Sequence, residues 1–290
     1  MILDGKILSD TIKDNLKEEI NTLLKKDIRP GLGVILVGEN IESKTYVNMK
    51  KKACNELGIY SKVYELPDNI SEDIIIQKIK DLNEDNTIHG ILVQLPLPYH
   101  INKQNVLDSI KHEKDVDGLG ILNTGKLMIN NNVNIMPCTP RGCIELLDHY
   151  KIPLKSKEIT IIGTSNLVGL PLSIMLLHRG ATVTLCNIHT NDVRKKTKDA
   201  DIVIACCGVP EMVKSDWVKE ESIIIDIGIN KIEDKKSKKG YRLVGDVDYN
   251  NVKDKVEYIT PVPGGIGPMT IAILMKQTVE ICRLINISKM

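Results

Sequence analysis

The feature that most constrains the fold of this chain is an alternation of short apolar segments with stretches of helical periodicity. The apolar segments have the length of strands, and several are apolar on both faces, as strands buried in a parallel sheet are. They are Gly33–Val37, Gly90–Gln94, Ile159–Ile162, Thr182–Cys186, Ile202–Cys206 and Ile223–Ile227, and the helical patterns between them include Lys44–Leu57, Ser71–Asn83, Arg141–Tyr150 and Leu170–His178. The alternation predicts βαβ units with right-handed crossovers, and therefore an α/β fold.

The length and the grouping of these segments indicate two domains. A chain of 290 residues is long enough for about two domains of ordinary size. One sheet falls within residues 1–139, and a second begins near Lys157 and ends near Val262. The segment Pro137–Pro140 precedes a helix that can bridge the domains, and the final helix, from Pro268 on, can cross back to the first domain.

The composition argues against several classes of protein. Lys and Arg number 39 against 38 Asp and Glu, so the chain lacks the basic excess of a protein that coats nucleic acid. No apolar run approaches the roughly 18 residues of a membrane span, and the first residues lack the pattern of a signal peptide. The 7 cysteines form no Cys-x-x-Cys pair, which favours reduced thiols in a cytoplasmic protein. We expect the charge run Lys235–Lys239 to be a solvated loop, with a basic partner surface as the weaker alternative.

A glycine turn in the second domain has the layout of a phosphate-binding site. The strand Glu158–Ile162 leads into a turn, Gly163–Gly169, and then into a helix whose amino end favours an anion. The middle glycine of the usual Gly-x-Gly-x-x-Gly pattern is missing, so a structural turn without ligand is an equal alternative. The next strand ends at Cys186–His189 without the acid that usually binds the ribose of NAD. A further glycine follows in Asp226–Asn230 and fits either a close ligand or a plain turn.

One lysine of the first domain lies on the wrong face of its helix. When Tyr46 is set at zero on a helical wheel, Lys50 falls in the apolar stripe that also holds Ala53, Cys54 and Leu57, with Ser43 at its edge. The other lysines of the segment fall on the opposite face. An inward lysine either extends its stem to an ion partner or keeps an amine with a lowered pKa.

Three further segments contain candidate residues for a ligand site. Gln94 ends a buried strand, at the edge of the sheet where open α/β folds bind ligands. The segment Lys114–Gly118 places Asp115 and Asp117 in a loop that offers too few oxygens for a metal site, so no metal is expected. The segment Thr260–Thr270 is so rich in glycine and proline that we expect it to face a ligand.

Taken together and in this order, these motifs resemble the bifunctional methylenetetrahydrofolate dehydrogenase/methenyltetrahydrofolate cyclohydrolase (FolD) family. The resemblance runs from Leu3 to the final helix. It rests on Ser43-x-x-Tyr46-Val47-x-x-Lys50, Val93–Pro98, Lys114–Gly118, Pro137–Pro140 and Pro261–Thr270.

The resemblance implies a fold and an activity. The fold is α/β with two domains, an N-terminal α/β catalytic domain and a C-terminal Rossmann-like doubly wound parallel sheet, joined by long helices with the active-site cleft between them. The folate-binding catalytic domain would comprise residues 1–144 plus 269–290, and the dinucleotide-binding domain residues 145–268. The activity is oxidation of 5,10-methylenetetrahydrofolate by NADP, followed by hydrolysis to 10-formyltetrahydrofolate. A cytoplasmic homodimer that binds tetrahydrofolate derivatives, without nucleic acid or membrane partners, is implied as well.

The resemblance also assigns residues by their positions in these motifs. The catalytic and folate-binding set is Lys50, Tyr46, Gln94 and Asp117; the substrate-binding set is Ser43, Pro263, Gly264 and Gly265; and the dinucleotide-binding set is Gly163, Thr164, Ser165, Ile188 and Ile229. The chain departs from many members at Thr164, where they carry Arg, and at Asn187–Ile188, where they carry His-Ser or His-Arg. Leu119–Ile121 replaces a frequent Phe-His-Pro. NAD therefore stays an alternative to NADP.

The chemistry of the two steps gives these residues distinct tasks. Hydride removal from the N–CH2–N carbon releases no proton and needs positioning alone, whereas hydrolysis needs a base for the attacking water. We expect a neutral Lys50 to be that base, with Gln94 holding the amine and Tyr46 shaping the pocket. Asp117 is expected to accept two hydrogen bonds from the amino-pyrimidinone edge of the pterin.

Alternative functions remain open at this point. Another two-domain dehydrogenase, of the shikimate or hydroxyacid type, would share the plan of two α/β domains. A non-enzymatic nucleotide-binding protein would account for the altered glycine turn. A member of the family that retains only one of the two activities is the third alternative.

Overall fold

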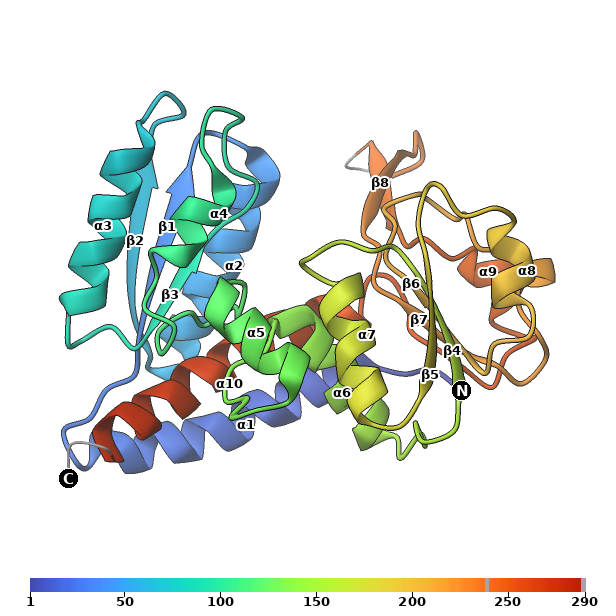
Figure 1. Ribbon diagram of the computed structural model, residues 1–290, viewed down its shortest axis with the longest axis horizontal. Coiled ribbons are helices and arrows are strands. Elements are labelled where there is room, and N and C mark those ends of the chain that lie inside the picture. Colours follow the sequence, from blue (N-terminus) through green and yellow to red (C-terminus); the bar gives the residue numbers. More distant parts are fainter. Residues whose placement is uncertain (238–239, 288–290) are drawn as a thin grey trace. The chain divides into compact units, whose positions relative to one another are not determined.

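The computed structural model describes residues 1–237 and 240–287 and divides into two compact units, each built on a parallel sheet (Figure 1). The three-stranded unit comprises Asp10–Cys138 and the chain from Ile271 on. The five-stranded unit comprises Met1–Ser9 and Thr139–Thr270. The predicted two-domain α/β fold is thereby confirmed.

The three-stranded unit has helices on both faces of its sheet. Its strands are parallel in the order β2-β1-β3, and their bounds are β1 (Gly31–Val37), β2 (Tyr60–Leu66) and β3 (Gly90–Val93). Its helices are α2 (Ile41–Leu57), α3 (Glu72–Glu84), α4 (Lys103–Asp108) and α5 (Ile121–Ile129), with most of α1 (Gly5–Leu24) and α10 (Ile266–Ile287). Because side chains alternate along β1, Leu32 and Leu36 pack with α2 and α10, while Ile35 and Val37 pack with α3.

The five-stranded unit is a doubly wound sheet. Its bounds are α6 (Cys138–His149), β4 (Glu158–Ile162), α7 (Gly169–His178), β5 (Thr182–Cys186), α8 (Val193–Thr197), β6 (Ile202–Ala205), the 3-10 turn η1 (Ser215–Trp217), β7 (Ile223–Asp226), α9 (Tyr249–Val252) and β10 (Tyr258–Ile259). All strands are parallel, in the order β10-β7-β6-β4-β5. Counted within the unit this is the order 2-1-3-4-5, whose winding direction reverses between β4 and β6. Ligands of such sheets bind at the carboxyl ends of the strands where the direction reverses.

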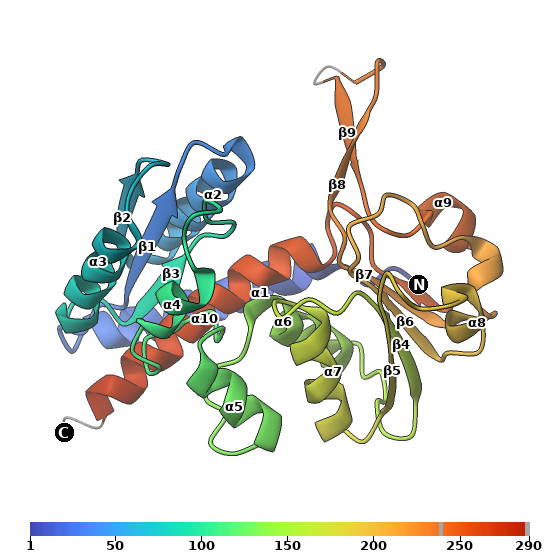
Figure 2. The same ribbon diagram turned by 45° about the horizontal axis from the view of Figure 1, so that its top comes forward.

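A two-stranded antiparallel hairpin follows β7. Its strands are β8 (Asn230–Glu233) and β9 (Tyr241–Val244), and Figure 2 shows the hairpin standing away from the five-stranded sheet. The predicted solvated loop lies at its tip. Lys235 and Lys236 are exposed there as expected, and Lys238 and Lys239 lie outside the described residues.

The units differ in extent from the expected domains. The first residues of the chain pack with the five-stranded unit, because the amide of Leu3 donates to the carbonyl of Ile259 at 2.9 Å and extends the sheet edge at β10. Residues 139–144 and 269–270 also fall in that unit, whereas we expected them in the catalytic domain. The functional domain boundaries stay a prediction.

The predicted strands are all present, and the errors lie in half-exposed elements. Strand β5 has the predicted bounds, and the other predicted strands differ by one or two residues at an end. Strand β2 was missed because its side chains are half-buried or exposed, which leaves no apolar run in the sequence. Within the described residues, no helix has both the length and the apolar character needed to cross a bilayer.

Candidate functional site

Helix α2 is well defined at both ends, and this fixes the register of its inward face. The side chain of Asn40 accepts a hydrogen bond from the amide of Ser43, and Gly58 ends the helix in the left-handed conformation that glycine favours. The side chains buried along the helix are Ser43, Val47, Lys50, Ala53, Cys54 and Leu57. The predicted inward orientation of Lys50 is therefore correct.

The amine of Lys50 is held by the amide side chain that sequence analysis paired with it. Lys50 is only 9% exposed, and its Nζ donates to Oε1 of Gln94 at 2.9 Å. Gln94 follows β3 directly, and its Nε2 donates to the carbonyl of Leu95 at 2.8 Å, so the oxygen of the side chain is the part turned toward the lysine. Burial lowers the pKa of the Lys50 amine below its ordinary value, and the charge of Asp117 opposes that shift.

Tyr46 lies at the border of the buried face rather than at its centre. It is 37% exposed, whereas its neighbour Val47 is buried in the core. The row of α2 that is buried includes Val47, Lys50 and Cys54. Part of the Tyr46 ring is therefore accessible from outside the core.

Asp117 lies on a loop whose backbone is fixed by buried polar groups. Asp115, which is 2% exposed, accepts hydrogen bonds from the amide of Gly120 at 2.9 Å and from Nδ2 of Asn123 at 3.0 Å. Burial raises the pKa of the Asp115 carboxyl, although the hydrogen bonds oppose this shift. The amine of Lys114 donates to the carbonyl of Asp85 at 2.9 Å. The half-buried carboxylate of Asp117 lies between these anchors and close enough to Lys50 to affect its pKa.

Gln277 of α10 anchors the same loop from the other side. This fully buried amide donates through Nε2 to the carbonyl of Val116 at 2.7 Å and to that of Met136 at 2.9 Å. Its Oε1 accepts from the amide of Met136 at 2.9 Å. Because Val116 directly precedes Asp117, Gln277 fixes the backbone immediately before that residue.

The glycine turn of the five-stranded unit fits a phosphate. Gly163 has a φ of +121°, and a Cβ on Gly169 would overlap the carbonyl of Gly163, so the turn lies tightly against the start of α7. Among the described residues, the backbone amides of residues 164–167 donate no hydrogen bond. These unused donors, at a helix amino end and beside the reversal point of the sheet, suit an anionic group.

The segment after β5 carries an apolar side chain at position 188. It forms a turn in which Thr190 Oγ1 accepts from the amide of Asn187 at 2.9 Å. Ile188 projects from this turn and is 94% exposed. The segment therefore carries neither the acid of an NAD site nor a cationic group at position 188.

Within the five-stranded unit, the glycine- and proline-rich segment contacts the first residues of the chain and Ile229, which is predicted to bind the dinucleotide. The carbonyl of Gly264 accepts from the amide of Lys6 at 3.0 Å, and a Cβ on Gly5 would overlap the carbonyl of Gly265. A Cβ on Gly267 would lie 3.4 Å from Cδ1 of Ile229. Pro263 is exposed at the tip of the loop. Ile229 and the loop thus form one surface.

Two buried carboxylates, those of Asp226 and Asp246, lie beneath this surface, and neither was assigned from the sequence. Asp226 accepts hydrogen bonds from the amides of Gly228, Asp246 and Val247. Burial raises the pKa of Asp226 to about 7, against the effect of those hydrogen bonds.

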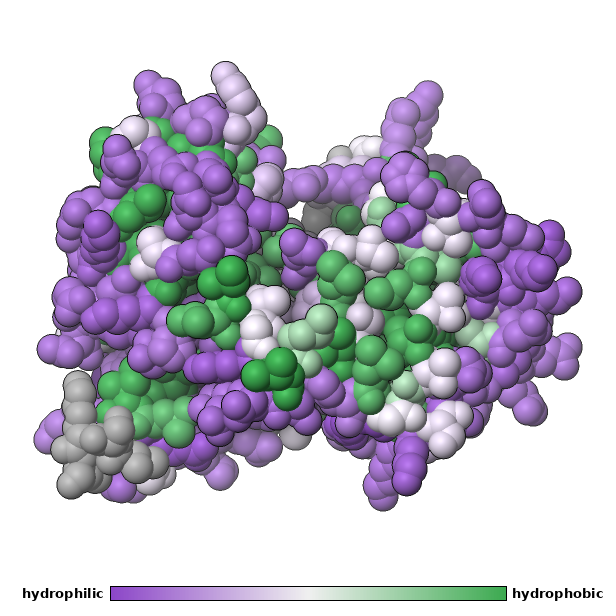
Figure 3. All heavy atoms as spheres, viewed as in Figure 1, coloured by the Kyte–Doolittle hydropathy of each residue, from purple (hydrophilic) through white to green (hydrophobic). Residues whose placement is uncertain are grey.

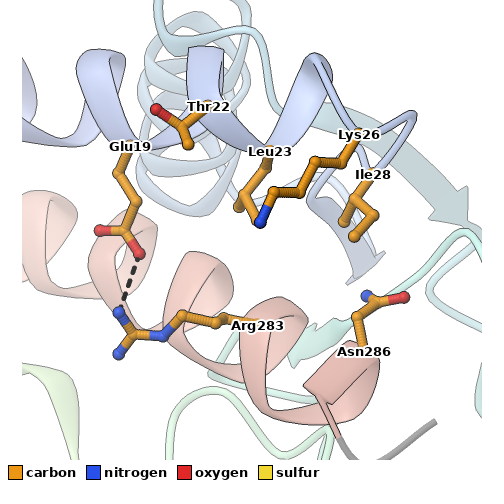
Figure 4. Close-up of a pocket in the computed structure, with 7 residues that line it drawn as sticks. All are labelled: Glu19, Thr22, Leu23, Lys26, Ile28, Arg283 and Asn286. Carbon is orange, nitrogen blue, oxygen red and sulfur yellow. Dashed lines mark hydrogen bonds and ion pairs between the residues drawn. The ribbon is translucent and has the colours of Figure 1, made fainter. Parts of the chain in front are cut away.

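Two concave pockets lie elsewhere in the three-stranded unit. The one in Figure 4 has a volume of about 340 Å³ and is lined mainly by α1 and α10, which the ion pair of Glu19 with Arg283 connects at 3.3 Å. A second, of about 410 Å³, is lined by Arg29, Tyr60 and His89 among others. Neither of these two pockets is lined by a predicted site residue.

Comparison with known proteins covers nearly the whole chain. Residues 3–117 match the family described as tetrahydrofolate dehydrogenase/cyclohydrolase, catalytic domain, and residues 137–286 match the NAD(P)-binding domain of the same family. The chain belongs to the tetrahydrofolate dehydrogenase/cyclohydrolase family. The bifunctional protein FolD of Nautilia profundicola is 50% identical over 279 residues, which are 96% of each chain.

Solved structures agree with this family. The bifunctional enzyme FolD from Campylobacter jejuni is 48% identical, with a TM-score of 0.94 over 98% of this chain and 99% of that one. The enzyme from Trypanosoma brucei, complexed with NADP cofactor and inhibitor, is 36% identical, with a TM-score of 0.95 over 99% and 98% of the two chains. Shikimate dehydrogenase from Aquifex aeolicus, at 13% identity and a TM-score of 0.50, shares the fold alone. The shikimate-type alternative is therefore set aside in favour of the tetrahydrofolate family.

Three of the residues predicted for the site lie close together, whereas the residues that support them were not predicted. Lys50, Gln94 and Asp117 were singled out, and the contacts of Lys50 confirm that they lie together. Gln277 and Asp115 were not assigned. The only available signal for Gln277 was a polar residue on an apolar helix, which is weak without knowledge of its distant partner.

We predict that Gln277→Leu destabilises the protein by about 1–3 kcal/mol, because the carbonyl of Val116 and the amide of Met136 lose their buried partner. Guanidinium unfolding measures the change. The matched control is Gln77→Leu, at an exposed position of α3. Equal stability of the two variants would contradict the anchoring role of Gln277.

Proposed function

We propose that this chain is a bifunctional enzyme of one-carbon metabolism. It oxidises 5,10-methylenetetrahydrofolate to the methenyl form with NADP and hydrolyses that product to 10-formyltetrahydrofolate. The observation that supports this most directly is the buried amine of Lys50 bound to Gln94 in a member of the tetrahydrofolate family. A buried, uncharged amine is the group that the hydrolytic step requires.

The oxidation depends on position rather than on acid or base chemistry. The bound dinucleotide supplies the acceptor for the hydride of the N–CH2–N carbon. The amides of the turn that contains Gly163, Thr164 and Ser165 are suited to hold its phosphates, and Ile188 and Ile229 present apolar surface to it. NADP is favoured by the relative that carries it, and the exposed Ile188 leaves its extra phosphate to be bound by backbone or by other side chains.

The hydrolysis depends on Lys50. Water attacks the methenyl cation and must lose a proton, and an amine whose preference for the charged form is weakened by burial is suited to accept it. A cationic substrate beside the amine would lower its pKa further. Gln94 holds the amine by accepting its hydrogen bond, and Tyr46 forms a wall of the pocket with its half-exposed ring.

Further residues are assigned to the folate in this proposal. Asp117 accepts two hydrogen bonds from the amino-pyrimidinone edge of the pterin, as a carboxylate can. Ser43 lies about two helical turns before Lys50 on the same buried face of α2. Pro263, Gly264 and Gly265 contribute backbone that a flat ligand can approach closely.

We further infer a cytoplasmic homodimer that serves purine, methionine and histidine biosynthesis. Apolar side chains gather over α7 and the neighbouring edge strand β5, as Figure 3 shows for this face; they are those of Leu170, Leu177 and Leu185. An open edge strand flanked by such side chains is a surface that a second copy can cover. Light scattering coupled to size exclusion tests the dimer.

We predict that the purified protein forms methenyl and then formyl product from methylenetetrahydrofolate, with a higher kcat/KM for NADP than for NAD. Absorbance of the reduced dinucleotide follows the first step, and decay of the methenyl chromophore follows the second. A clear preference for NAD would overturn the cofactor assignment. Absence of both products would overturn the function.

We predict that Lys50→Met lowers the cyclohydrolase rate by about 10²–10⁴-fold, the usual loss for a general base. Folate binding, measured by calorimetry, should persist. The matched control is Lys51→Met, which removes the neighbouring lysine from the exposed face of the same helix. In the unmodified enzyme the cyclohydrolase rate should fall as the pH drops through the lowered pKa of Lys50, because an ammonium cannot accept a proton. Near-normal hydrolysis by Lys50→Met would remove Lys50 from the mechanism.

We predict that Asp117→Ala weakens folate binding and impairs both steps, since both need the pterin in place. Measuring KM and kcat for the two reactions separately tests this. Glu113→Ala, an exposed acid in the same stretch of chain, is the control. Unchanged constants for Asp117→Ala would refute its role as the pterin anchor.

A further inference from the structure

Two buried carboxylates at the carboxyl end of the five-stranded sheet bind backbone from several segments at once. Asp246, which is fully buried, accepts through Oδ2 from the amides of Cys207 at 2.7 Å and Gly208 at 2.9 Å. Its Oδ1 accepts from Nδ2 of Asn230 at 2.8 Å. Asp246 therefore joins the segment after β6 to the start of β8.

Asp226 extends this network to the segment of Asp246 itself. Its Oδ1 accepts from the amides of Gly228 at 3.1 Å and Asp246 at 2.9 Å, and its Oδ2 from the amide of Val247 at 2.9 Å. The backbone amide of Asp226 donates to Oγ1 of Thr260, the first residue of the glycine- and proline-rich segment. The two carboxylates thus hold three segments, and the backbone amide of Asp226 contacts a fourth.

The glycines of these segments are required by the carboxylates. A Cβ on Gly228 would overlap the carboxylate of Asp246, and a Cβ on Gly245 would overlap that of Asp226. Backbone without side chains is what lets several amides converge on each acid. Gly228 is the glycine of Asp226–Asn230, for which the sequence allowed either a close ligand or a plain turn. The carboxylate of Asp246 explains why a glycine is needed there.

The segments held in this way are those beside the dinucleotide site. A Cβ on Gly163 would overlap the carbonyl of Cys206, so the segment that leads to Cys207 and Gly208 packs against the glycine turn at the reversal point of the sheet. Ile229 lies between Gly228 and Asn230, and each of those neighbours donates to one of the two acids.

We propose that Asp246, supported by Asp226, is a positioning residue that sets the backbone against which the dinucleotide binds. The inference rests on the proposed function. Neither acid reaches the dinucleotide, since both are buried, and both act through the amides they hold. Disturbing Asp246 should therefore weaken dinucleotide binding and leave the hydrolytic step, which needs no dinucleotide, unchanged.

The test is Asp246→Asn, which keeps the shape of the side chain but offers one acceptor oxygen to three donors. We expect the calorimetric Kd for NADP and the KM for NADP to rise about tenfold or more, with the cyclohydrolase rate on methenyltetrahydrofolate within twofold of the unmodified enzyme. Asp254→Asn, at an exposed position of the same unit, is the matched control and should change neither value.

Several outcomes would overturn the inference. An unchanged Kd for NADP in Asp246→Asn would do so, and so would a parallel fall of both activities with the melting temperature, which is what a purely structural role produces. If Asp246→Asn does not fold, Asn230→Ala decides, because it removes one donor to Asp246 at a half-buried position; it should raise the Kd for NADP severalfold. If neither variant folds, the contact of Asp246 with Asn230 is required for folding itself, and the proposal is overturned. If instead the unmodified protein neither binds nor reduces a dinucleotide, it is the proposed function that fails.

Discussion

The site depends on the removal of one lysine amine from water. An ordinary lysine has a pKa of about 10.4, and each unit by which burial lowers it represents about 1.4 kcal/mol of lost preference for the charged form. The protein meets this with a helix capped at Asn40 and Gly58, a row of apolar neighbours on α2 and one acceptor, the side-chain oxygen of Gln94. The neutral acceptor stabilises the amine without the full charge that would return it to the ammonium form. Asp117 opposes the shift, so its distance from Lys50 matters to the chemistry as well as to folate binding.

In both units, buried carboxylates fix the backbone, whereas Lys50 is proposed to act on the substrate. Asp115 in one and Asp226 with Asp246 in the other accept hydrogen bonds chiefly from backbone amides. Such contacts order loops that have no regular secondary structure, because each acceptor collects donors from segments that would otherwise be hydrated. The loops ordered in this way carry Asp117 and Ile229. The groups proposed to touch ligands are thus separated from the groups that fix their places.

Features that depend on neighbouring residues could be predicted from the sequence, whereas contacts between residues far apart in the chain could not. Periodicity predicted β4, β5 and α2 and the inward orientation of Lys50, because each of these features depends on residues that are neighbours in the chain. It missed β2, whose half-exposed side chains include Ser61, Lys62 and Glu65 and give no apolar run. It also missed the contact of Gln277 with Val116, since those residues are 161 positions apart and only the folded chain brings them together.

Glycine is the residue type whose meaning changes most between the sequence and the structure. Gly5, Gly228 and Gly245 leave room for a carbonyl or a carboxylate of the protein itself, so their presence says nothing direct about a ligand. The turn after β4 differs, because its amides at residues 164–167 donate no hydrogen bond among the described residues. Unused donors at a helix amino end are stronger support for a phosphate site than a glycine pattern is. The missing middle glycine of this turn therefore weighs less against dinucleotide binding than the spacing alone suggested.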